Sequence, residues 1–347
     1  MKKWRSMLVV SFVFVLAGLL LQAPAAFSAE QKVYKLTASG AFPPAEASNK
    51  YLLVPLMKEI ENASGGRLQI TVHTGGALGK AQDHFDMAAS GIVDISLSVQ
   101  AYTRGRFPLS AVVELPFLAP SGECGARILW GLYQKFPEFR AEYKDVKVLG
   151  LHCYGANQLL MGKKPVHDLA AAKGLKIRGT GEVQGEMIKR MGAVPLSMAA
   201  PELYESLDKG VIDGTFFAFG AARGFRFFEV TKHVTVGDFF VGPQFLVMNL
   251  RTWNSLPPDL QNTIDKLTGE RAAVMGGKGY DSEDSAGLQD FQKAKTEIYQ
   301  LPADELARWK ATFAPISESW VAALEAKGLP GRKIFDEAKR IAGTCGK

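Results

Sequence analysis

Two copies of one short pattern, about 120 residues apart, constrain the fold of this chain more than any other feature of its sequence. Residues 87–94 read MAASGIVD, and residues 206–213 read SLDKGVID. Each copy has a helix end, a glycine, two β-branched residues and an aspartate, and an apolar strand and a polar loop precede each helix. Glycine ends a helix because it tolerates a left-handed turn. The repetition indicates two lobes of similar build, although a helix–glycine–strand joint is also common in any α/β domain.

Strand and helix patterns alternate along the rest of the body, as in an α/β fold. Strands are expected at residues 67–72, 92–97, 146–151, 175–178 and 193–197, and helices at 81–89, 183–191 and 202–207. After the two prolines at 257–258 the chain is expected to be helical over 259–278, 283–300 and 303–327. A chain of 347 residues exceeds what one core usually serves, which also favours two lobes.

The N-terminus has the order of a secretory signal. Residues 1–5 are basic, residues 7–21 are a nearly unbroken apolar run, and residues 23–29 are mostly small. The apolar run is short for a retained membrane span, although an uncleaved N-terminal anchor is the alternative. We expect residues 1–29 to be a signal peptide, a mature chain that begins near Ala29 or Glu30, and a location in the periplasm. No cysteine follows the apolar run, which argues against a lipid anchor.

The charge of the chain excludes a nucleic-acid surface. The formal net charge is +6, and three of the cations belong to the predicted signal peptide. The remaining excess of Lys and Arg is small and evenly interleaved with Asp and Glu, whereas a nucleic-acid surface needs a basic patch. We therefore expect no nucleic-acid partner.

The three cysteines match no zinc or redox motif. In an oxidising compartment one disulfide is possible, and Cys124 with Cys345 is the preferred pair, while three free thiols are the alternative. Cys153 ends an apolar strand and is interpreted as a small buried hydrophobic residue.

Motifs for catalysis are absent from the sequence. It contains no Gly-x-Ser-x-Gly, His-Glu-x-x-His or Gly-x-Gly-x-x-Gly. Residues 75–81 resemble a phosphate loop, but Thr74 replaces its first glycine and no Ser or Thr follows Lys80. The five histidines are scattered, which does not suggest a metal site. We expect no enzymatic activity, no cofactor and no metal.

An ordered set of short motifs resembles the solute-binding proteins of tripartite ATP-independent periplasmic (TRAP) transporters, the DctP-like family. The most informative run has KGLKIR at 173–178, MGAVPLSM at 191–198, ELY at 202–204 and GVIDG at 210–214. LGK at 78–80 and LPFL at 115–118 match the N-terminal lobe of the family. Each motif is weak alone, but their order covers essentially the whole chain after the predicted signal peptide.

The resemblance implies a two-lobed α/β periplasmic binding protein (type II-like) whose lobes are joined by crossing strands and a long helix. The first lobe is expected to comprise residues 30–154 and 242–282. The second is expected to comprise residues 155–241 and 283–347, including the C-terminal helices.

The resemblance also assigns a ligand site. An arginine at the position of Arg178 grips the ligand carboxylate in the family, and its guanidinium offers two parallel N–H donors that match a carboxylate. A surface or interlobe ion pair is the alternative role for this arginine. The predicted ligand-binding residues are Arg178, Gln158, Phe216, Phe217, Tyr154, Phe239 and Phe240.

Departures from the family pattern predict the kind of ligand. Gln158 stands where the sialic-acid-type members have a second arginine, and Phe216 and Phe217 stand where 2-oxo-acid members have metal-assisting residues. Phenylalanines remove polar partners, so a polyhydroxylated acid would leave hydroxyls unpaired at about 1–3 kcal/mol each. We expect a hydrophobic or aromatic monocarboxylate. Tyr154, Phe239 and Phe240 could extend the apolar wall, or simply belong to the cores of the lobes.

The function predicted from these patterns is capture of a small organic carboxylate and its delivery to the integral-membrane subunits of a TRAP permease. We expect the binding protein to be a monomer. Two alternatives are a receptor that presents ligand to a membrane sensor and a secreted enzyme on the same scaffold.

Overall fold

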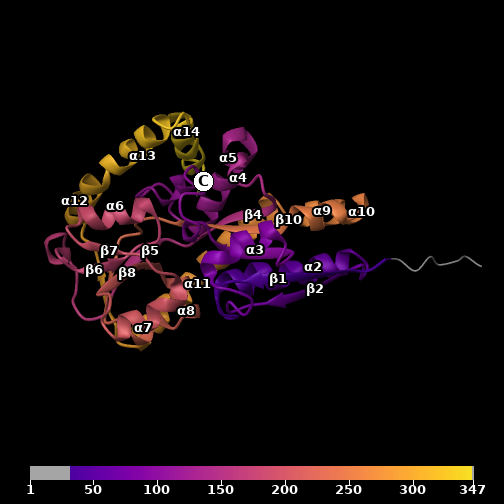
Figure 1. The fold of residues 1–347 in the computed structure, drawn as a ribbon. Helices are drawn as coiled ribbons and strands as arrows, with labels where there is room; N and C mark the ends of the chain where they lie inside the picture. The colour runs from indigo at the N-terminus through magenta and orange to yellow at the C-terminus, as the bar shows by residue number, and fades with distance from the viewer. Residues whose placement is uncertain (1–31, 346–347) are drawn as a thin grey trace, which may run out of the picture. The chain divides into compact units, whose positions relative to one another are not determined.

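Two mixed β-sheets organise the fold (Figure 1), and the computed structural model describes residues 32–345. The first sheet has the order β2 (Leu68–His73), β1 (Tyr34–Gly40), β3 (Ile95–Val99), β10 (Gly242–Asn249) and β4 (Val146–Tyr154). β1 is parallel to β2 and β3, whereas β10 is antiparallel to β3 and β4. The sheet is therefore a parallel α/β unit with an antiparallel pair added at one side.

The second sheet repeats this plan with six strands. Its order is β11 (Glu297–Gln300), β9 (His233–Val236), β5 (Asn157–Met161), β8 (Gly214–Ala218), β6 (Lys176–Arg178) and β7 (Val194–Leu196). β6 is parallel to β7 and β8, and β5 is antiparallel to β8 and β9. The chain passes from the first sheet to the second at residues 155–156 and returns at residues 237–241. These are the crossing segments that the resemblance implies.

The repeated helix–glycine–aspartate pattern has the same structure in both sheets. Asp94 accepts a hydrogen bond at 2.8 Å from the backbone N–H of Thr37 in β1. Asp213 accepts one at 2.8 Å from the backbone N–H of Lys176 in β6. The glycine three residues before each aspartate has a left-handed φ, 84° and 70°. Each aspartate thus fastens its own strand to the neighbouring parallel strand, so the two copies are structurally equivalent.

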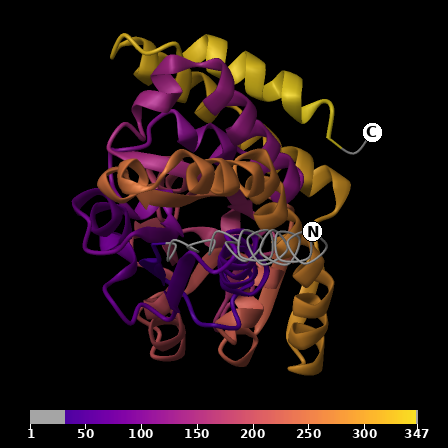
Figure 2. The same cartoon turned by 90° about the vertical axis from the view of Figure 1, so that its right-hand side faces the viewer.

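The helices surround these sheets. They are α2 (Val54–Ala63), α3 (His84–Ser90), α4 (Gly122–Lys135), α5 (Pro137–Ala141), α6 (Glu182–Arg190), α7 (Leu203–Asp208), α8 (Phe219–Gly224), α9 (Leu250–Ser255), α10 (Pro258–Leu267), α11 (Glu270–Lys293), α12 (Ala303–Phe313), α13 (Pro315–Glu325) and α14 (Gly331–Ala342). The C-terminal helices α12, α13 and α14 form an arch beside α6 and α4 (Figures 1 and 2). Residues 32–345 contain no helix with the length and apolar content that a bilayer span requires.

The long helix α11 joins the two halves of the fold. It packs on β4 and α4 of the first half and on α8 of the second. Glycines allow this close packing: a Cβ at Gly277 would lie 2.5 Å from the carbonyl oxygen of Gly122, and one at Gly287 would lie 2.3 Å from that of Phe219.

Four expectations for the C-terminal region were wrong. The helix expected over 259–278 is divided at residues 268–269 into α10 and α11, and the helix expected over 303–327 is divided at Ala314 into α12 and α13. The expected break at residues 279–282 does not occur, because Gly276, Gly277 and Gly279 serve close packing of α11 rather than ending it. The expected helix over 283–300 ends at Lys293, and Glu297–Gln300 forms strand β11, which pairs in parallel with β9. Lys295 has a left-handed φ of 59°, which turns the chain between helix and strand.

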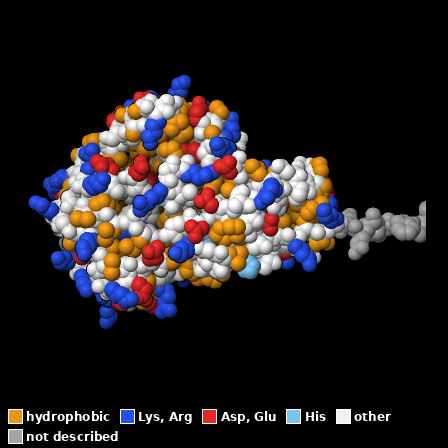
Figure 3. Space-filling view, in the orientation of Figure 1, with side chains coloured by type: hydrophobic (Ala, Val, Ile, Leu, Met, Phe, Trp, Pro, Cys, Tyr) orange, Lys and Arg blue, Asp and Glu red, His pale blue; other side chains and the backbone are white. Residues whose placement is uncertain are grey.

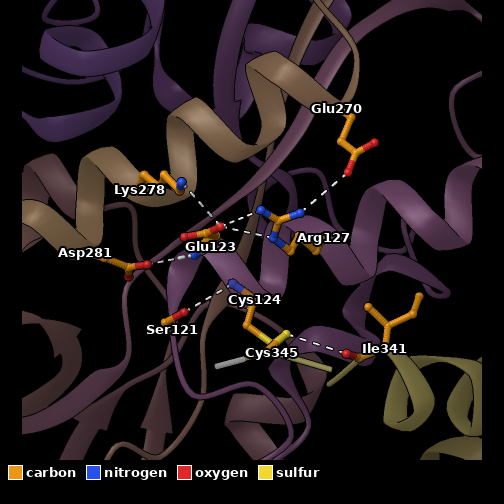
Figure 4. Close-up of polar contacts among 9 residues, drawn as sticks. All are labelled: Ser121, Glu123, Cys124, Arg127, Glu270, Lys278, Asp281, Ile341 and Cys345. Carbon is orange, nitrogen blue, oxygen red and sulfur yellow. Dashed lines mark hydrogen bonds and ion pairs between the residues drawn. A yellow bond between two sulfur atoms is a disulfide. The ribbon is translucent and has the colours of Figure 1, made fainter. Parts of the chain in front are cut away.

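The preferred disulfide is confirmed. Cys124, on α4, is bonded to Cys345, just beyond α14, and so ties the C-terminal arch to the first half of the fold (Figure 4). Cys153 is a free and fully buried thiol, as expected. Lys, Arg, Asp and Glu side chains are interspersed over the face seen in Figure 3.

The predicted signal peptide, residues 1–29, lies outside the described residues, so its cleavage stays a prediction. The division into lobes at the stated residues also stays a prediction.

Candidate functional site

Arg178 is held at the end of the short strand β6 by contacts from both halves of the fold. Its side chain is 3% exposed. Nε donates to the backbone carbonyl of Met198 at 3.0 Å, and a terminal nitrogen donates to the hydroxyl of Tyr102 at 3.3 Å. The guanidinium also lies over the ring of Phe217, 5.9 Å from its centroid. None of these described partners is a carboxylate, so the positive charge is buried without a counter-charge in contact.

A cavity adjoins Arg178 and is lined from both sheets. Val99 of β3 and Gln244 of β10 belong to the first sheet, and Arg178 of β6 and Phe217 of β8 belong to the second. The space between the lining atoms, open solvent included, is about 370 Å³. The cavity is lined by residues of both sheets, and one of them is the buried, positively charged Arg178. Such a cavity is suited to a small anion.

Four aromatic rings and the guanidinium form a closed circuit around the cavity. Phe42 contacts Tyr102 with 6.5 Å between ring centroids and Phe225 with 5.9 Å. Phe225 contacts Phe217 at 5.8 Å, and Arg178 lies over Phe217 and bonds Tyr102. The pairs of rings meet edge to face, the arrangement that aromatic quadrupoles favour. A planar apolar ligand would meet aromatic faces or edges on several sides.

Two tyrosines complete the wall. Tyr154, at the end of β4, and Tyr280, in the middle of α11, meet edge to face at 6.4 Å. The Tyr154 hydroxyl accepts a hydrogen bond from the Gln184 amide at 3.4 Å. The Tyr280 hydroxyl accepts one from the Gln244 amide at 2.8 Å and donates one to Glu46. Burial raises the pKa of both tyrosines well above the usual value, so both phenols stay protonated.

Glu46 brings a buried carboxyl group to the same cavity. It follows β1 and is 1% exposed. Its Oε2 accepts the backbone N–H of Ser48 at 2.9 Å and the Ser48 hydroxyl, and its Oε1 accepts the Tyr280 hydroxyl. Burial raises the pKa of Glu46, while the bonds from Ser48 and Tyr280 oppose the shift.

A second buried carboxyl group lies behind the loop that follows Arg178. Glu114 accepts a hydrogen bond from the Gln184 amide at 2.8 Å, and the same Gln184 side chain accepts the backbone N–H of Thr180 at 3.0 Å. Burial raises the pKa of Glu114 to about 7, and the Gln184 bond and the charge of Arg178 oppose this. The Glu114–Gln184–Thr180 network therefore fixes the loop at the rim of the cavity.

Thr180 separates this cavity from a second one. The second cavity has about 1260 Å³ of space between atoms and is lined by Thr180, Glu114 and residues of α13, among others. The Thr180 side chain is buried, and its hydroxyl has no hydrogen-bond partner among the described residues. This hydroxyl is available to a ligand.

Three of the seven predicted site residues line the cavity: Arg178, Tyr154 and Phe217. The other four lie elsewhere. Phe216 contacts Phe239 at 5.3 Å and Phe240 at 5.5 Å, and all three belong to the largest hydrophobic core. Successive residues of a strand point to opposite faces, so the single strand β8 sends Phe217 to the cavity and Phe216 to the core.

Gln158, the fourth of these, has a structural position. Its side-chain oxygen accepts the backbone N–H groups of Gly237 at 2.9 Å and Asp238 at 3.0 Å, and its nitrogen donates to the Asp238 carboxylate at 2.6 Å. These bonds occupy the Gln158 amide group and hold residues 237–241, the segment by which the chain returns to the first sheet. Gln158 is not part of the cavity lining.

Residues that sequence reasoning missed supply most of the wall. Phe42 and Tyr102 follow strands β1 and β3, Phe225 follows α8, and Tyr280 lies within α11. The only sequence signal for Tyr280 is the run of glycines around it, which marks a helix packed closely on other backbone. The described residues hold no group of three or more His, Cys, Asp or Glu side chains able to bind a metal.

The fold has two mixed sheets, strands that cross between them, a long joining helix and a cavity with a buried arginine that is lined from both sheets. These features define the class of two-lobed α/β periplasmic binding proteins. Within that class, the model of the bacterial extracellular solute-binding protein family 7 (DctP) matches residues 39–323, and the chain belongs to this family. The family consists of the solute-binding proteins of TRAP transporters, which are transport receptors and not enzymes.

Solved structures and a curated relative agree with this assignment. A TRAP solute-binding protein from Rhodoferax ferrireducens T118, solved with copurified benzoate, is 29% identical, with a TM-score of 0.86 over 90% of this chain and 98% of that one. A marine metagenome TRAP protein specific for aromatic acids, solved with 3-hydroxybenzoate, is 27% identical, with a TM-score of 0.87 over 91% of this chain and 100% of that one. The C4-dicarboxylate-binding periplasmic protein DctP of Rhodobacter capsulatus is 25% identical over 79% of this chain and 82% of its own.

Proposed function

We propose that this TRAP solute-binding protein captures an aromatic monocarboxylate. The observation that carries the proposal is the Arg178 guanidinium, buried without a carboxylate partner among the described residues, at the side of a cavity walled by aromatic rings. A ligand carboxylate would supply the missing counter-charge through a bidentate, charge-assisted bond. The benzoate and 3-hydroxybenzoate of the two solved relatives support the same ligand class.

The magnitudes favour a ring over a sugar. An apolar ring gains about 25 cal/mol for each Å² that it buries, and edge-to-face contacts with Phe42, Phe217 or Phe225 add about 0.5–1.5 kcal/mol each. A uronic acid in the same place would put hydroxyls against these rings, and each unpaired hydroxyl would cost about 1–3 kcal/mol.

The proposed contacts are Arg178 and the hydroxyls of Tyr102 and Thr180 to the carboxylate, and Phe217 and Tyr154 to the ring. Gln158, Phe216, Phe239 and Phe240 are not included, because their side chains lie outside the cavity lining.

The test is the affinity of Arg178→Ala for benzoate and phenylacetate, measured by calorimetry against the unchanged protein. Truncating one partner of a buried charge pair costs about 2–5 kcal/mol, so we expect affinity to fall about 30-fold to several thousand-fold. The control is Arg308→Ala, which removes an exposed arginine of α12 that pairs with Asp304. The proposal fails if both variants bind alike, or if the unchanged protein binds uronates and no aromatic acid.

Delivery to the membrane follows from membership of the TRAP family. We propose that the ligand passes to the integral-membrane subunits of a TRAP permease, in the periplasm, and that the binding protein acts as a monomer. We also propose that residues 30–154 with 242–282 and residues 155–241 with 283–347 act as two lobes that close on the ligand. The two sheets, with the crossing segments between them, support this division.

A further inference from the structure

The carboxylate of Glu283, on the joining helix α11, binds groups from both halves of the fold. Its Oε1 accepts hydrogen bonds from Lys50 Nζ at 2.6 Å and from the Tyr51 hydroxyl, and both donors lie in the helical turn Asn49–Leu53. Its Oε2 accepts a hydrogen bond from the guanidinium of Arg223, near the end of α8. We refer to Lys50, Tyr51, Glu283 and Arg223 as the Glu283 cluster.

The Glu283 cluster holds a charged carboxylate in a nearly buried position. The Glu283 side chain is 7% exposed, whereas those of Lys50 and Arg223 are 46% and 40% exposed. Burial alone would raise the pKa of Glu283, but the hydrogen bonds from the three donors of the cluster lower it to about 2. Glu283 therefore stays ionised near neutral pH, and its bond from Lys50 is charge-assisted.

The two sides of the Glu283 cluster are fastened differently. Helix α8 is tied to α11 by further bonds, because the backbone N–H of Gly220 donates to Asp284 at 2.8 Å. The Nε of Arg223 likewise donates to Asp290 of α11 at 2.8 Å. The turn 49–53 belongs to the first half, and in the proposed division the second lobe takes over α11 at residue 283. Separation of the proposed lobes would therefore break the bonds from this turn to Glu283 and leave the bond from Arg223 in place.

The segments that the Glu283 cluster joins also carry two walls of the cavity. Phe42 and Glu46 precede the turn 49–53, Phe225 follows α8, and all three line the cavity. Phe42 and Phe225 meet edge to face with 5.9 Å between ring centroids, and a Cβ at Gly224 would lie 2.6 Å from the Cα of Glu46. The four residues of the cluster are not part of the cavity lining. The cluster thus joins the two walls without touching a ligand in the cavity.

We propose that Lys50 is a positioning residue for solute capture, whose bond to Glu283 holds the two cavity walls together in the closed arrangement. A contact that is made only in the closed state favours that state, and so raises the affinity for any solute that the cavity encloses. This inference rests on the proposed function, because it assumes that the proposed lobes close on a ligand. It adds to that function a residue outside the cavity that sets the affinity.

The test is the Kd of Lys50→Met for benzoate and phenylacetate, measured by calorimetry at low salt. Methionine keeps most of the length of the side chain and removes its charge. The acceptor is nearly buried but the lysine is half-exposed, so affinity should fall about 3- to 30-fold, by the same factor for both acids. The matched control is Lys209→Met, because Lys209 also bonds a glutamate at 2.6 Å, in an exposed ion pair with Glu205. This control should keep the Kd values of the unchanged protein.

Two further measurements identify the bond to Glu283 as the cause. The ratio of the Kd of Lys50→Met to that of the unchanged protein should fall toward unity as NaCl rises from about 20 mM to about 1 M, because salt screens the half-exposed pair. Salt weakens the contact of the ligand with Arg178 in both proteins alike, so this effect cancels in the ratio. In a Glu283→Gln background, Lys50→Met should lower affinity by less than about twofold, since the charged partner is already gone.

The outcomes separate this inference from the proposed function. Unchanged affinity of Lys50→Met overturns the role of Lys50 while aromatic-acid capture stands. The same holds if only one of the two acids is affected, which would place Lys50 in contact with the ligand, or if the full loss persists at high salt. If a uronate binds and no aromatic acid does, the proposed function fails, and the same Kd ratios measured with the uronate test Lys50. The salt comparison needs only the single variant, so a poorly folding Glu283→Gln leaves the inference testable.

Discussion

The substitution Gly277→Ala should weaken the packing of α11 against α4 and so destabilise the fold. A Cβ there would lie 2.5 Å from the carbonyl oxygen of Gly122, 2.6 Å from its carbonyl carbon and 2.7 Å from the nitrogen of Glu123, all of them backbone atoms. Backbone cannot rotate away as a side chain can, so the two helices must separate. Asp281 on α11 accepts an N–H bond from Gly122 at 2.7 Å and, as Figure 4 shows, one from Glu123 at 2.8 Å. Separation of the helices would stretch this cap.

The magnitude of Gly277→Ala follows from three contributions. Overpacking costs about 1–3 kcal/mol, and loss of a helix cap costs about 0.5–2 kcal/mol. Alanine in a helix interior gains about 1 kcal/mol over glycine. The expected net loss in the free energy of unfolding is about 0.5–4 kcal/mol.

Gly185 in α6 is the matched control, because no atom lies within 4 Å of a Cβ placed there. Gly185→Ala should therefore keep the helix gain of about 1 kcal/mol and lose nothing. The assay is urea unfolding of both variants and the unchanged protein, followed by far-UV circular dichroism, with the slope m compared between them. Equal stabilisation by both substitutions would show that the contact of α11 with α4 is not tight, and the reasoning would be refuted.

Two further predictions concern a buried acid and the disulfide. Burial raises the pKa of Glu114 from 4.5 to about 7. Between these pH values the native state keeps a proton on Glu114 that the unfolded state releases. The free energy of unfolding should therefore fall by about 3 kcal/mol as the pH rises across this window. Urea unfolding at pH 4.5 and pH 8 should show this loss relative to Glu114→Gln, and a constant difference between the two proteins would contradict it. Cys345→Ser opens the bridge to Cys124 across a sequence separation of 221 and should lower stability by about 2–5 kcal/mol. The same loss should appear on reducing the unchanged protein, and an unshifted midpoint under reductant would contradict the prediction.

The sequence allowed the fold to be predicted where local chemistry repeats. The helix–glycine–aspartate pattern indicated two similar units, and Asp94 and Asp213 make equivalent bonds in the two sheets. The end of the chain was harder to predict, because glycine has two opposite roles. It can end a helix, or it can let another backbone approach, and only the packing of α11 against α4 and α8 decides for the second.

The site was predictable only in part, for a geometric reason. Phe216 and Phe217 look identical in a short apolar run, but strand β8 turns one to the core and the other to the cavity. Phe42, Tyr102 and Phe225 come from three different connections, and no spacing in the sequence relates them. Their approach depends on how the two sheets pack, so no local pattern could have revealed it.

The proposed anion site depends on both halves of the fold through one residue. Tyr102 follows β3 of the first sheet, yet its hydroxyl accepts hydrogen bonds from Arg178 at 3.3 Å and from the backbone N–H of Ala200 at 2.9 Å, both on the side of the second sheet. Arg178 is therefore oriented partly by a residue of the opposite sheet. Moving the sheets apart would break the hydrogen bond between Tyr102 and Arg178 that orients the guanidinium. A ligand that bridges Arg178 to the aromatic wall gains its full binding free energy only when the sheets are together. Ligand affinity and the closed arrangement must then be thermodynamically coupled, because a ligand favours the state to which it binds more tightly.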